Sequence, residues 1–249
     1  MNTGFTEKEI HDAVKERYGA HARGETVPGS IPLIDKEGRM KPEAVGYSAE
    51  ETAAVPETAE TGLSCGAPLA YLKLFEGAVV VDLGSGGGMD CILASQRVGA
   101  SGHVYGIDMT GEMLELAERN SLEAGCGNIT YIDSEIEDIP LEDECADFVI
   151  SNCVLNLVPD KARAFRESCR ILRPGGQFCF SDIVTTKPVS AKMKASMAAH
   201  TACAAGAIPV DEYMEMLSAA GFSDIEMVNS RDWPFYNGFA SIQIRGVKK

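Results

Sequence analysis

Short runs of β-branched residues alternate with longer amphipathic segments between residues 78 and 247. The run at 78–83 (AVVVDL) follows a glycine and carries no polar residue before Asp82, which is typical of a strand buried on both faces. Further strands are predicted at 103–108, 128–132, 147–151, 177–182, 224–228 and 239–247, with helices at 89–98, 110–124, 159–172 and 210–220. This alternation predicts an α/β fold with a mostly parallel seven-stranded sheet and helices on both faces.

The N-terminal segment has a different pattern. Ile10, Val14 and Tyr18 are four residues apart, which places them on one apolar stripe of a short helix over 6–19. Residues 20–60 are rich in Gly, Pro, Glu and Thr and are expected to form an extended arm.

A second interruption follows the fifth strand, where residues 184–208 are rich in Ala, Lys and Met. We expect them to form a helical insertion, which the 210–220 helix follows. The turn at Arg173-Pro-Gly-Gly176 lies earlier and ends the 159–172 helix. The predicted domains are therefore 1–74, a helix and arm that contribute to the substrate site, and 75–249, which carries a cap at about 184–208.

A glycine-rich loop ends the first strand. Asp82-Leu-Gly84-Ser-Gly86-Gly-Gly88 leads directly into a helix, and glycine permits the close backbone approach that a ligand at a helix N-terminus requires. Asp108 ends the second strand, where a carboxylate can accept hydrogen bonds from both ribose hydroxyls. A dinucleotide fingerprint would need glycine at Met89, which disfavours a dehydrogenase. A Gly-rich turn that binds nothing is the alternative.

Charge narrows the classes of partner. The 249 residues include 37 acidic and 22 basic side chains, which gives a formal charge of −15. Nucleic acids and anionic membranes both need clustered Lys and Arg, so neither is expected as a partner. The N-terminus has no signal-peptide core, and the longest uncharged run, 195–210, is shorter than a membrane span. We therefore expect a cytoplasmic protein.

Eight cysteines form no C-x-x-C pair, which argues against a zinc ribbon or a thioredoxin-like site. In a reducing cytosol they should be free thiols. Cys65 lies in a turn before the first strand, Cys153 just past the fourth, and Cys203 inside the insertion. Since ligands bind at the carboxyl ends of strands, these three could converge. The other five are expected to be structural: Cys91, Cys126, Cys145, Cys169 and Cys179.

The glycine loop and the acid after the second strand resemble those of class I S-adenosylmethionine-dependent methyltransferases. The resemblance implies their Rossmann-like fold and cofactor, and adenine binding after the third strand by Glu135 and Ile136. A solvated acidic loop at 133–138 is the alternative there. The residues that the resemblance assigns to the cofactor are Asp82, Gly84, Ser85, Gly86, Gly88, Asp108, Met109, Glu135, Ile136 and Asn152.

A narrower resemblance is to the arsenite methyltransferases, and it covers nearly the whole chain. The motifs that carry it are YSAEE at 47–51, GLSCG at 62–66, DLGSGGGMDC at 82–91, GIDMT at 106–110, SNCVLNL at 151–157 and CAAGA at 203–207. It implies that Cys65, Cys153 and Cys203 bind As(III) and serve catalysis, with a thiol reductant of glutathione or thioredoxin type as co-substrate or partner. Many members carry another cysteine upstream of the Cys65 position; this sequence has none.

Thiols suit this chemistry, because soft As(III) prefers sulfur to carboxylate ligands. Arsenic held by sulfur keeps a lone pair that can attack a sulfonium methyl in line, so catalysis rests on positioning and needs no general base. The four histidines are too scattered for a metal motif, and His200 is expected at the surface. The alternatives are a methyltransferase for a quinone- or sterol-type molecule and a non-catalytic metalloid-binding protein.

Overall fold

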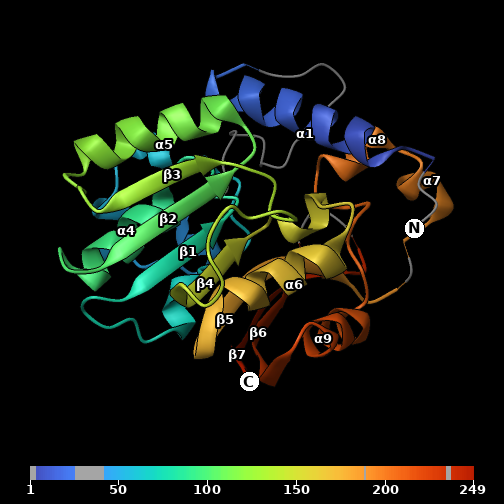
Figure 1. The fold of residues 1–249 in the computed structure, drawn as a ribbon. Coiled ribbons are helices and arrows are strands. Elements are labelled where there is room, and N and C mark those ends of the chain that lie inside the picture. Colours follow the sequence, from blue (N-terminus) through green and yellow to red (C-terminus); the bar gives the residue numbers. More distant parts are fainter. Residues whose placement is uncertain (1–3, 26–41, 188, 234–236) are drawn as a thin grey trace.

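The computed structural model describes residues 4–25, 42–187, 189–233 and 237–249. Seven strands form one sheet in the order β3-β2-β1-β4-β5-β7-β6 (Figure 1). All neighbouring pairs are parallel except those of β7, which runs antiparallel to both β5 and β6. The predicted α/β class is confirmed. The strands are β1 (Val79–Leu83), β2 (His103–Asp108), β3 (Ile129–Asp133), β4 (Ala146–Asn152), β5 (Leu172–Thr185), β6 (Phe222–Asp232) and β7 (Phe239–Lys248).

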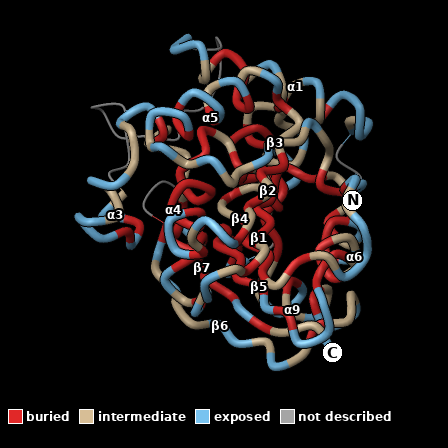
Figure 2. The backbone as a smooth tube through the Cα atoms, turned by 60° about the vertical axis from the view of Figure 1, so that its left-hand side comes forward, coloured by how far each residue is buried: buried red, intermediate tan, exposed pale blue. Residues whose placement is uncertain are grey.

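Helices cover both faces of the sheet, and side-chain alternation along the strands explains why. In β1, Val80 packs in one apolar cluster with α4 (Met89–Val98), whereas Val81 packs in another with α6 (Lys161–Ile171). The second cluster also takes in α9 (Val210–Ala219). Because both faces are covered, the central strands are buried along their length (Figure 2). Helix α5 (Gly111–Glu123) packs beside β2 and β3.

Helix α1 (Glu7–Ala22) extends the predicted N-terminal helix by three residues at its end. A capping box starts it, in which Thr6 and Glu9 each bond the other's backbone N–H. Ile10 and Val14 are buried, as their spacing predicts. The helix lies across the carboxyl ends of the strands, next to α5 and α8 (Figure 1).

The arm after α1 is more structured than expected. Residues 26–41 lie outside the described part of the chain. The remainder folds back on the sheet as short helices rather than an extended arm, because Val45, Tyr47 and Leu69 are buried in the cluster beneath α4. These helices are α2 (Pro42–Val45), α3 (Ala49–Ala53), η1 (Glu57–Ala59) and η2 (Pro68–Tyr71).

Two further boundaries differ from the sequence prediction. The turn at 173–176 is absorbed into the start of β5, since Leu172 already pairs with Ala146 before an irregularity in the ladder. The insertion forms two short helices, α7 (Ala191–Lys194) and α8 (Met197–His200), because Ser190 and Ser196 each cap a new helix. One 3-10 turn, η3 (Leu155–Leu157), links β4 to α6.

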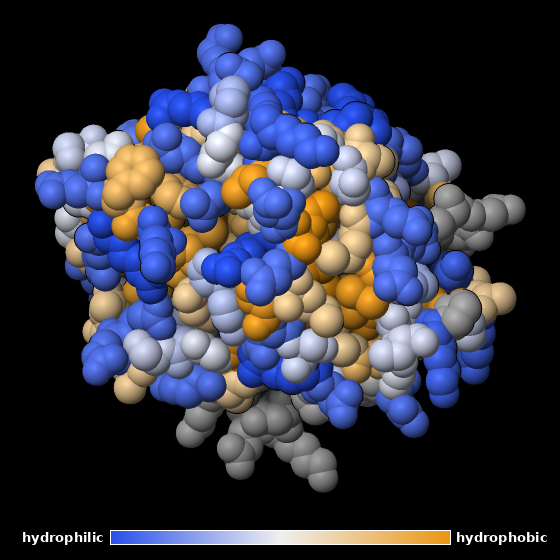
Figure 3. All heavy atoms as spheres, turned by 90° about the horizontal axis from the view of Figure 1, so that it is seen from below, coloured by the Kyte–Doolittle hydropathy of each residue, from blue (hydrophilic) through white to orange (hydrophobic). Residues whose placement is uncertain are grey.

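The described surface is a mixture of polar and apolar side chains, as the view from below shows (Figure 3). Large exposed hydrophobic residues in the described ranges are Phe75, Leu122 and Met227, which are scattered rather than gathered in one patch. The described helices are all too short or too polar to cross a membrane.

Candidate active site

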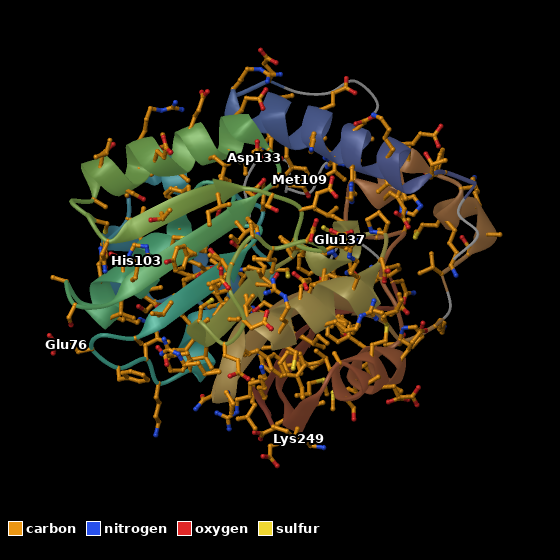
Figure 4. All side chains as sticks on the ribbon, in the orientation of Figure 1. Glu76, His103, Met109, Asp133, Glu137 and Lys249 are labelled. Atoms are coloured by element: carbon orange, nitrogen blue, oxygen red, sulfur yellow. The ribbon has the colours of Figure 1, made fainter. Side chains whose placement is uncertain are left out.

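A cleft opens at the carboxyl ends of β1, β2 and β4, with an empty volume of about 940 Å³ that includes space open to solvent. Met109 and Glu137 lie at this edge beneath α1, while His103 marks the opposite edge (Figure 4). The structure brings nine of the predicted site residues to its lining: Asp82, Gly84, Ser85, Gly86, Asp108, Met109, Ile136, Asn152 and Cys153.

The glycine loop is held against β2 by its backbone. The Gly84 N–H donates to the Ile107 carbonyl at 2.7 Å, and the Gly86 N–H donates to the Asp108 carboxylate at 3.0 Å. Gly84 has a positive φ of 72°, and a Cβ there would overlap a Val154 methyl. Only glycine can therefore close this turn. Gly88 does not line the cleft; it is the N-cap of α4 and serves the turn instead.

Buried carboxyl groups line the cleft. Asp82 and Asp90 are 2% and 6% exposed. Burial raises the pKa of Asp82 well above its usual range, and the neighbouring Asp90 charge adds to this; burial also raises the pKa of Asp90 to about 6. Asp90 Oδ1 and Ser85 Oγ have no hydrogen-bond partner within the described structure. These unsatisfied acceptors suit a ligand that carries positive charge and donor groups.

The predicted adenine side is only partly as expected. Ile136 lines the cleft, but the acid beside it is Glu137 rather than Glu135. Glu135 instead contacts His11 of α1, with Oε1 3.0 Å from Nδ1, and Glu137 Oε1 lies 3.4 Å from Nε2 of the same ring. These two carboxylates, Glu137 foremost, raise the pKa of His11. The three side chains also form a potential metal-ligand set, which the scatter of the histidines in sequence had concealed.

The three singled-out thiols converge. The sulfur atoms of Cys65 and Cys153 lie within 4.8 Å of each other and of an Asp182 carboxylate oxygen. Cys203 stands outside that set and contacts Cys153 instead, donating from Sγ to its carbonyl at 3.1 Å. Cys153 is the central thiol, since it interacts with the thiols of both others. All three belong to one buried apolar cluster.

Backbone strain and hydrogen bonds fix the thiols in place. Cys153 and Cys203 have positive φ values of 61° and 57°, a conformation that costs non-glycine residues roughly 1 kcal/mol or more and persists where surroundings enforce it. The Cys153 N–H donates to the Ser181 carbonyl at 2.8 Å. Cys65 receives a bond of 2.5 Å at its carbonyl from Ser241 Oγ of β7.

The surroundings of the three thiols favour their protonated forms. Burial raises the pKa of Cys65, and the hydrogen bond to Cys153 together with burial raises the pKa of Cys203 well above its usual range. The Cys153 pKa is also raised, by its bond to Cys65 and by burial, although its bond to Cys203 opposes the rise. Beside them, burial raises the pKa of Asp182 to about 7.

Asn152 links the cofactor cleft to the thiols. Its Oδ1 accepts from the Cys65 N–H at 3.1 Å. Its Nδ2 donates to the hydroxyl of Tyr47 at 2.8 Å and to Asp90 at 3.1 Å. Sequence reasoning placed Asn152 at the cofactor but missed Tyr47 and Asp90, since their role depends on how the arm packs.

Sequence reasoning also assigned the wrong surroundings to two residues, Tyr18 and His200. Tyr18 of α1 reaches the thiol cluster, with its hydroxyl 3.9 Å from Cys203 Sγ; its place on an apolar stripe suggested core packing only. His200 is not a surface residue, because it is 5% exposed and its Nε2 lies 2.9 Å from the Lys194 carbonyl. The α8 segment that carries it is folded down under α1.

Comparison with known proteins agrees with this geometry. A family model described as "Methyltransferase domain" matches residues 74–221. The arsenite methyltransferase of Halobacterium salinarum is 40% identical over 230 residues, 88% of this chain and 59% of that protein. The human arsenite methyltransferase is 34% identical over 174 residues, 66% of this chain and 46% of that protein. This chain thus spans about half to three fifths of the length of these relatives.

A solved structure extends the comparison to three dimensions. It is an arsenic(III) S-adenosylmethionine methyltransferase from Chlamydomonas reinhardtii, 31% identical, with a TM-score of 0.69. The alignment covers 82% of this chain and 75% of that one.

Proposed function

The chain belongs to the arsenite methyltransferase family of class I methyltransferases, and from that membership we propose that it transfers a methyl group from S-adenosylmethionine to trivalent arsenic held by cysteine thiolates. The observation that carries the proposal is the convergence of Cys65, Cys153 and Cys203 beside the cofactor cleft. A methyltransferase for a quinone- or sterol-type acceptor would have no use for three buried thiols at this point.

The cofactor would be held by the residues that line the cleft. S-adenosylmethionine supplies, when bound, a methyl group on a cationic sulfonium. Asp108, which already orders Gly86, offers its remaining lone pairs to ribose hydroxyls. Burial raises the pKa values of Asp82 and Asp90, and a cation beside them would favour their charged forms and oppose that rise. The unpartnered Ser85 Oγ and Asp90 Oδ1 supply further polar contacts.

Buried, protonated thiols are compatible with arsenite as the substrate. Arsenite carries hydroxyl groups, so each thiol that binds gives its proton to a departing hydroxide, and one water leaves for each As–S bond formed. The apolar cluster around the thiols excludes competing water. Arsenic held by Cys153 and Cys203, with Cys65 completing the site, keeps its lone pair for in-line attack on the sulfonium methyl. The protein contributes position rather than a general base.

Direct assay tests the assignment. Purified protein with S-adenosylmethionine, arsenite and a thiol reductant should give methylated arsenic, identified by chromatography with elemental detection. Calorimetry should show that S-adenosylmethionine binds without arsenite. Methyl transfer to an organic acceptor but not to arsenite would favour the quinone- or sterol-type alternative, whereas arsenite binding without cofactor binding would favour a non-catalytic metalloid-binding protein.

The co-substrate and compartment follow from the same chemistry. Free buried thiols persist in a reducing compartment, which supports a cytoplasmic location. A thiol reductant, small or of thioredoxin type, would return the cysteines to their free form after turnover.

A further inference from the structure

Asp182 is a buried carboxyl group that lies beside the thiols rather than in the cofactor cleft. It is part of β5, and one of its oxygens lies within 4.8 Å of the sulfur atoms of both Cys65 and Cys153. Its exposed fraction is 0%, and it does not line the cofactor cleft. A hydrogen-bond acceptor is therefore built into the thiol site itself.

The two oxygens of this carboxyl group have different surroundings. Oδ1 accepts from Asn156 Nδ2 at 2.9 Å and from the Ile183 N–H at 2.8 Å, and these two bonds fix the orientation of the group. Oδ2 has no hydrogen-bond partner among the described residues. A buried carboxyl oxygen without a donor is unfavourable, so Oδ2 is suited to a ligand that brings an O–H group.

The polar neighbours of Asp182 do not supply that donor. Burial raises the pKa of Asp182, and the charge of Lys161 opposes this rise. The Lys161 side chain itself is buried at the start of α6, with Nζ 3.4 Å from the Val158 carbonyl. The hydroxyl of Tyr213 also opposes the rise, but within the described ranges that hydroxyl too has no hydrogen-bond partner. The acceptor thus stays available to a ligand bound at the thiols.

Arsenite bound by two thiols would present such a donor. Trivalent arsenic takes three ligands, so arsenite that has bonded to Cys65 and Cys153 keeps one hydroxyl group. Cys203 lies outside the group that these two thiols form with Asp182, so the remaining hydroxyl can face the carboxyl group. The surrounding cluster is apolar, and a hydroxyl without a partner there would be unfavourable.

We propose that Asp182 binds the hydroxyl group that arsenic keeps after it has bonded to Cys65 and Cys153, and that it thereby selects arsenite over methylated trivalent arsenic. The inference rests on the proposed function. Each of the two thiols gives its proton to a departing hydroxide, so two waters leave, and the remaining As–O–H donates to the free Asp182 oxygen. Arsenic stays trivalent throughout. When Cys203 bonds in turn, its proton leaves with the last hydroxide as a third water.

The selectivity follows from the number of hydroxyl groups. Methylarsonous acid has two hydroxyls and one methyl group, so none of its hydroxyls remains once two thiols have bonded to arsenic. Asp182 then faces a methyl group, to which it cannot hydrogen-bond. The carboxyl group should therefore strengthen the binding of arsenite and contribute nothing to the binding of the methylated form.

Binding without turnover tests this contact. Arsenite and methylarsonous acid are each titrated by calorimetry into Cys203→Ser protein without S-adenosylmethionine, so that two thiols remain at the site. Adding Asp182→Asn should weaken arsenite binding at least roughly tenfold and change methylarsonous acid binding by less than about twofold. Because Oδ1 must remain an acceptor for Asn156 and Ile183, the amide places its NH₂ donor where the free oxygen was.

Tyr213→Phe in the same background is the matched control, since it removes the nearby hydroxyl and keeps the carboxyl group. It should change arsenite binding by less than about twofold. The proposal would be overturned if Cys203→Ser protein did not bind arsenite, if Asp182→Asn did not weaken arsenite binding, or if it weakened both arsenic compounds equally.

Two further measurements keep the outcome decisive. Should the Asp182→Asn variant not fold, infrared difference spectra of Cys203→Ser protein replace it: arsenite should shift a buried carboxyl band that methylarsonous acid leaves in place, and identical spectra would contradict the proposal. A methylation assay separates this inference from the proposed function. Failure of wild type to methylate arsenite would reject the proposed function, and the binding selectivity would still decide the role of Asp182.

Discussion

The thiol of Cys203 donates to the main-chain carbonyl of Cys153 at 3.1 Å, across fifty residues of sequence. Both residues adopt positive φ values. One hydrogen bond thus joins the cap to the end of β4 at the point where each backbone is strained. The cap position and the thiol geometry are consequently set together, so a change at either residue should affect methyl transfer without affecting the remote end of the cofactor cleft.

Replacement of Cys203 by serine should abolish arsenite methylation while preserving the fold. Serine can still bond the Cys153 carbonyl, but its hard oxygen is a poor ligand for As(III). We expect the rate to fall by more than the roughly 10–100-fold that loss of an outer-shell partner costs, with the dissociation constant for S-adenosylmethionine within about twofold. Cys126→Ser, in a half-buried position away from the site, is the matched control. Full activity in Cys203→Ser would remove Cys203 from the ligand set.

Asp108→Asn should weaken cofactor binding. The carboxylate accepts from the Gly86 N–H at 3.0 Å and the Thr110 N–H at 2.9 Å, so an amide would lose charge-assisted bonds both to the loop and to the ribose. Loss of such bonds corresponds to a dissociation constant about 10–100-fold higher, measured by calorimetry. Asp133→Asn, at the exposed end of β3, should change it by less than about twofold. If both variants bind S-adenosylmethionine similarly more weakly, the loss comes from the change in overall charge rather than from the Asp108 hydrogen bonds.

Gly84→Ala should destabilise the protein more than Gly125→Ala. Both positions have positive φ, 72° and 71°, so alanine at either one is strained by about 1 kcal/mol. At Gly84 the new methyl would also overlap Val154, whereas nothing lies within 4 Å of the Cβ position at Gly125. Overpacking should add about 1–3 kcal/mol to the loss in unfolding free energy. Urea denaturation of the two variants at one pH measures the difference, and equal losses would contradict the clash.

The His11 contacts predict a pH-dependent attachment of α1. Glu137 and Glu135 raise the pKa of His11 above 6.5, so the folded state favours the protonated ring. The resulting stability is fully present below pH about 6.5 and is lost as the pH rises through the raised pKa. The thermal midpoint of wild type should therefore exceed that of His11→Gln most clearly near pH 5.5, by the equivalent of about 0.5–1 kcal/mol, and the gap should close by pH 9.

His103 supplies the control for that experiment. Burial lowers its pKa, so the folded state favours the neutral ring and wild type loses stability as the pH falls. His103→Gln should remove this loss. The two variants should thus deviate from wild type in opposite directions at low pH. If the thermal midpoint of His11→Gln is lower than that of wild type by the same amount at every pH, packing rather than charge holds α1.

The order of strands and helices was predictable because each element has a local periodicity of hydrophobic residues. β1 is a β-branched run between glycines, and the loop after it is defined by glycine spacing. The end of β4 then places Cys153 at the ligand edge by topology alone. What local patterns could not supply is contact between distant segments. Asn152 joins the cleft to Cys65 only because the arm packs there, and no spacing in the sequence marks Tyr47 or Asp90 as its partners.

Polar residues were the least predictable. His200 and Lys161 are buried, although such residues usually lie at the surface, and their burial results from the cap folding under α1. Glu137 rather than Glu135 lines the cleft, although both carboxylates contact the same His11 ring. The family resemblance singled out the glycine loop and the three thiols, yet it gave no indication that Cys153 lies between the other two thiols.

The placement of β7 between β5 and β6 has a consequence for the order of assembly during synthesis. Strand β6 leaves the ribosome before β7 but has no partner in the sheet until β7 follows it, since β6 pairs with β7 alone. Strand β7 also carries Ser241, whose hydroxyl holds the Cys65 carbonyl. A nascent chain that ends before β7 therefore exposes an unfinished thiol pocket, because the Ser241 contact to the Cys65 segment forms only when β7 joins the sheet.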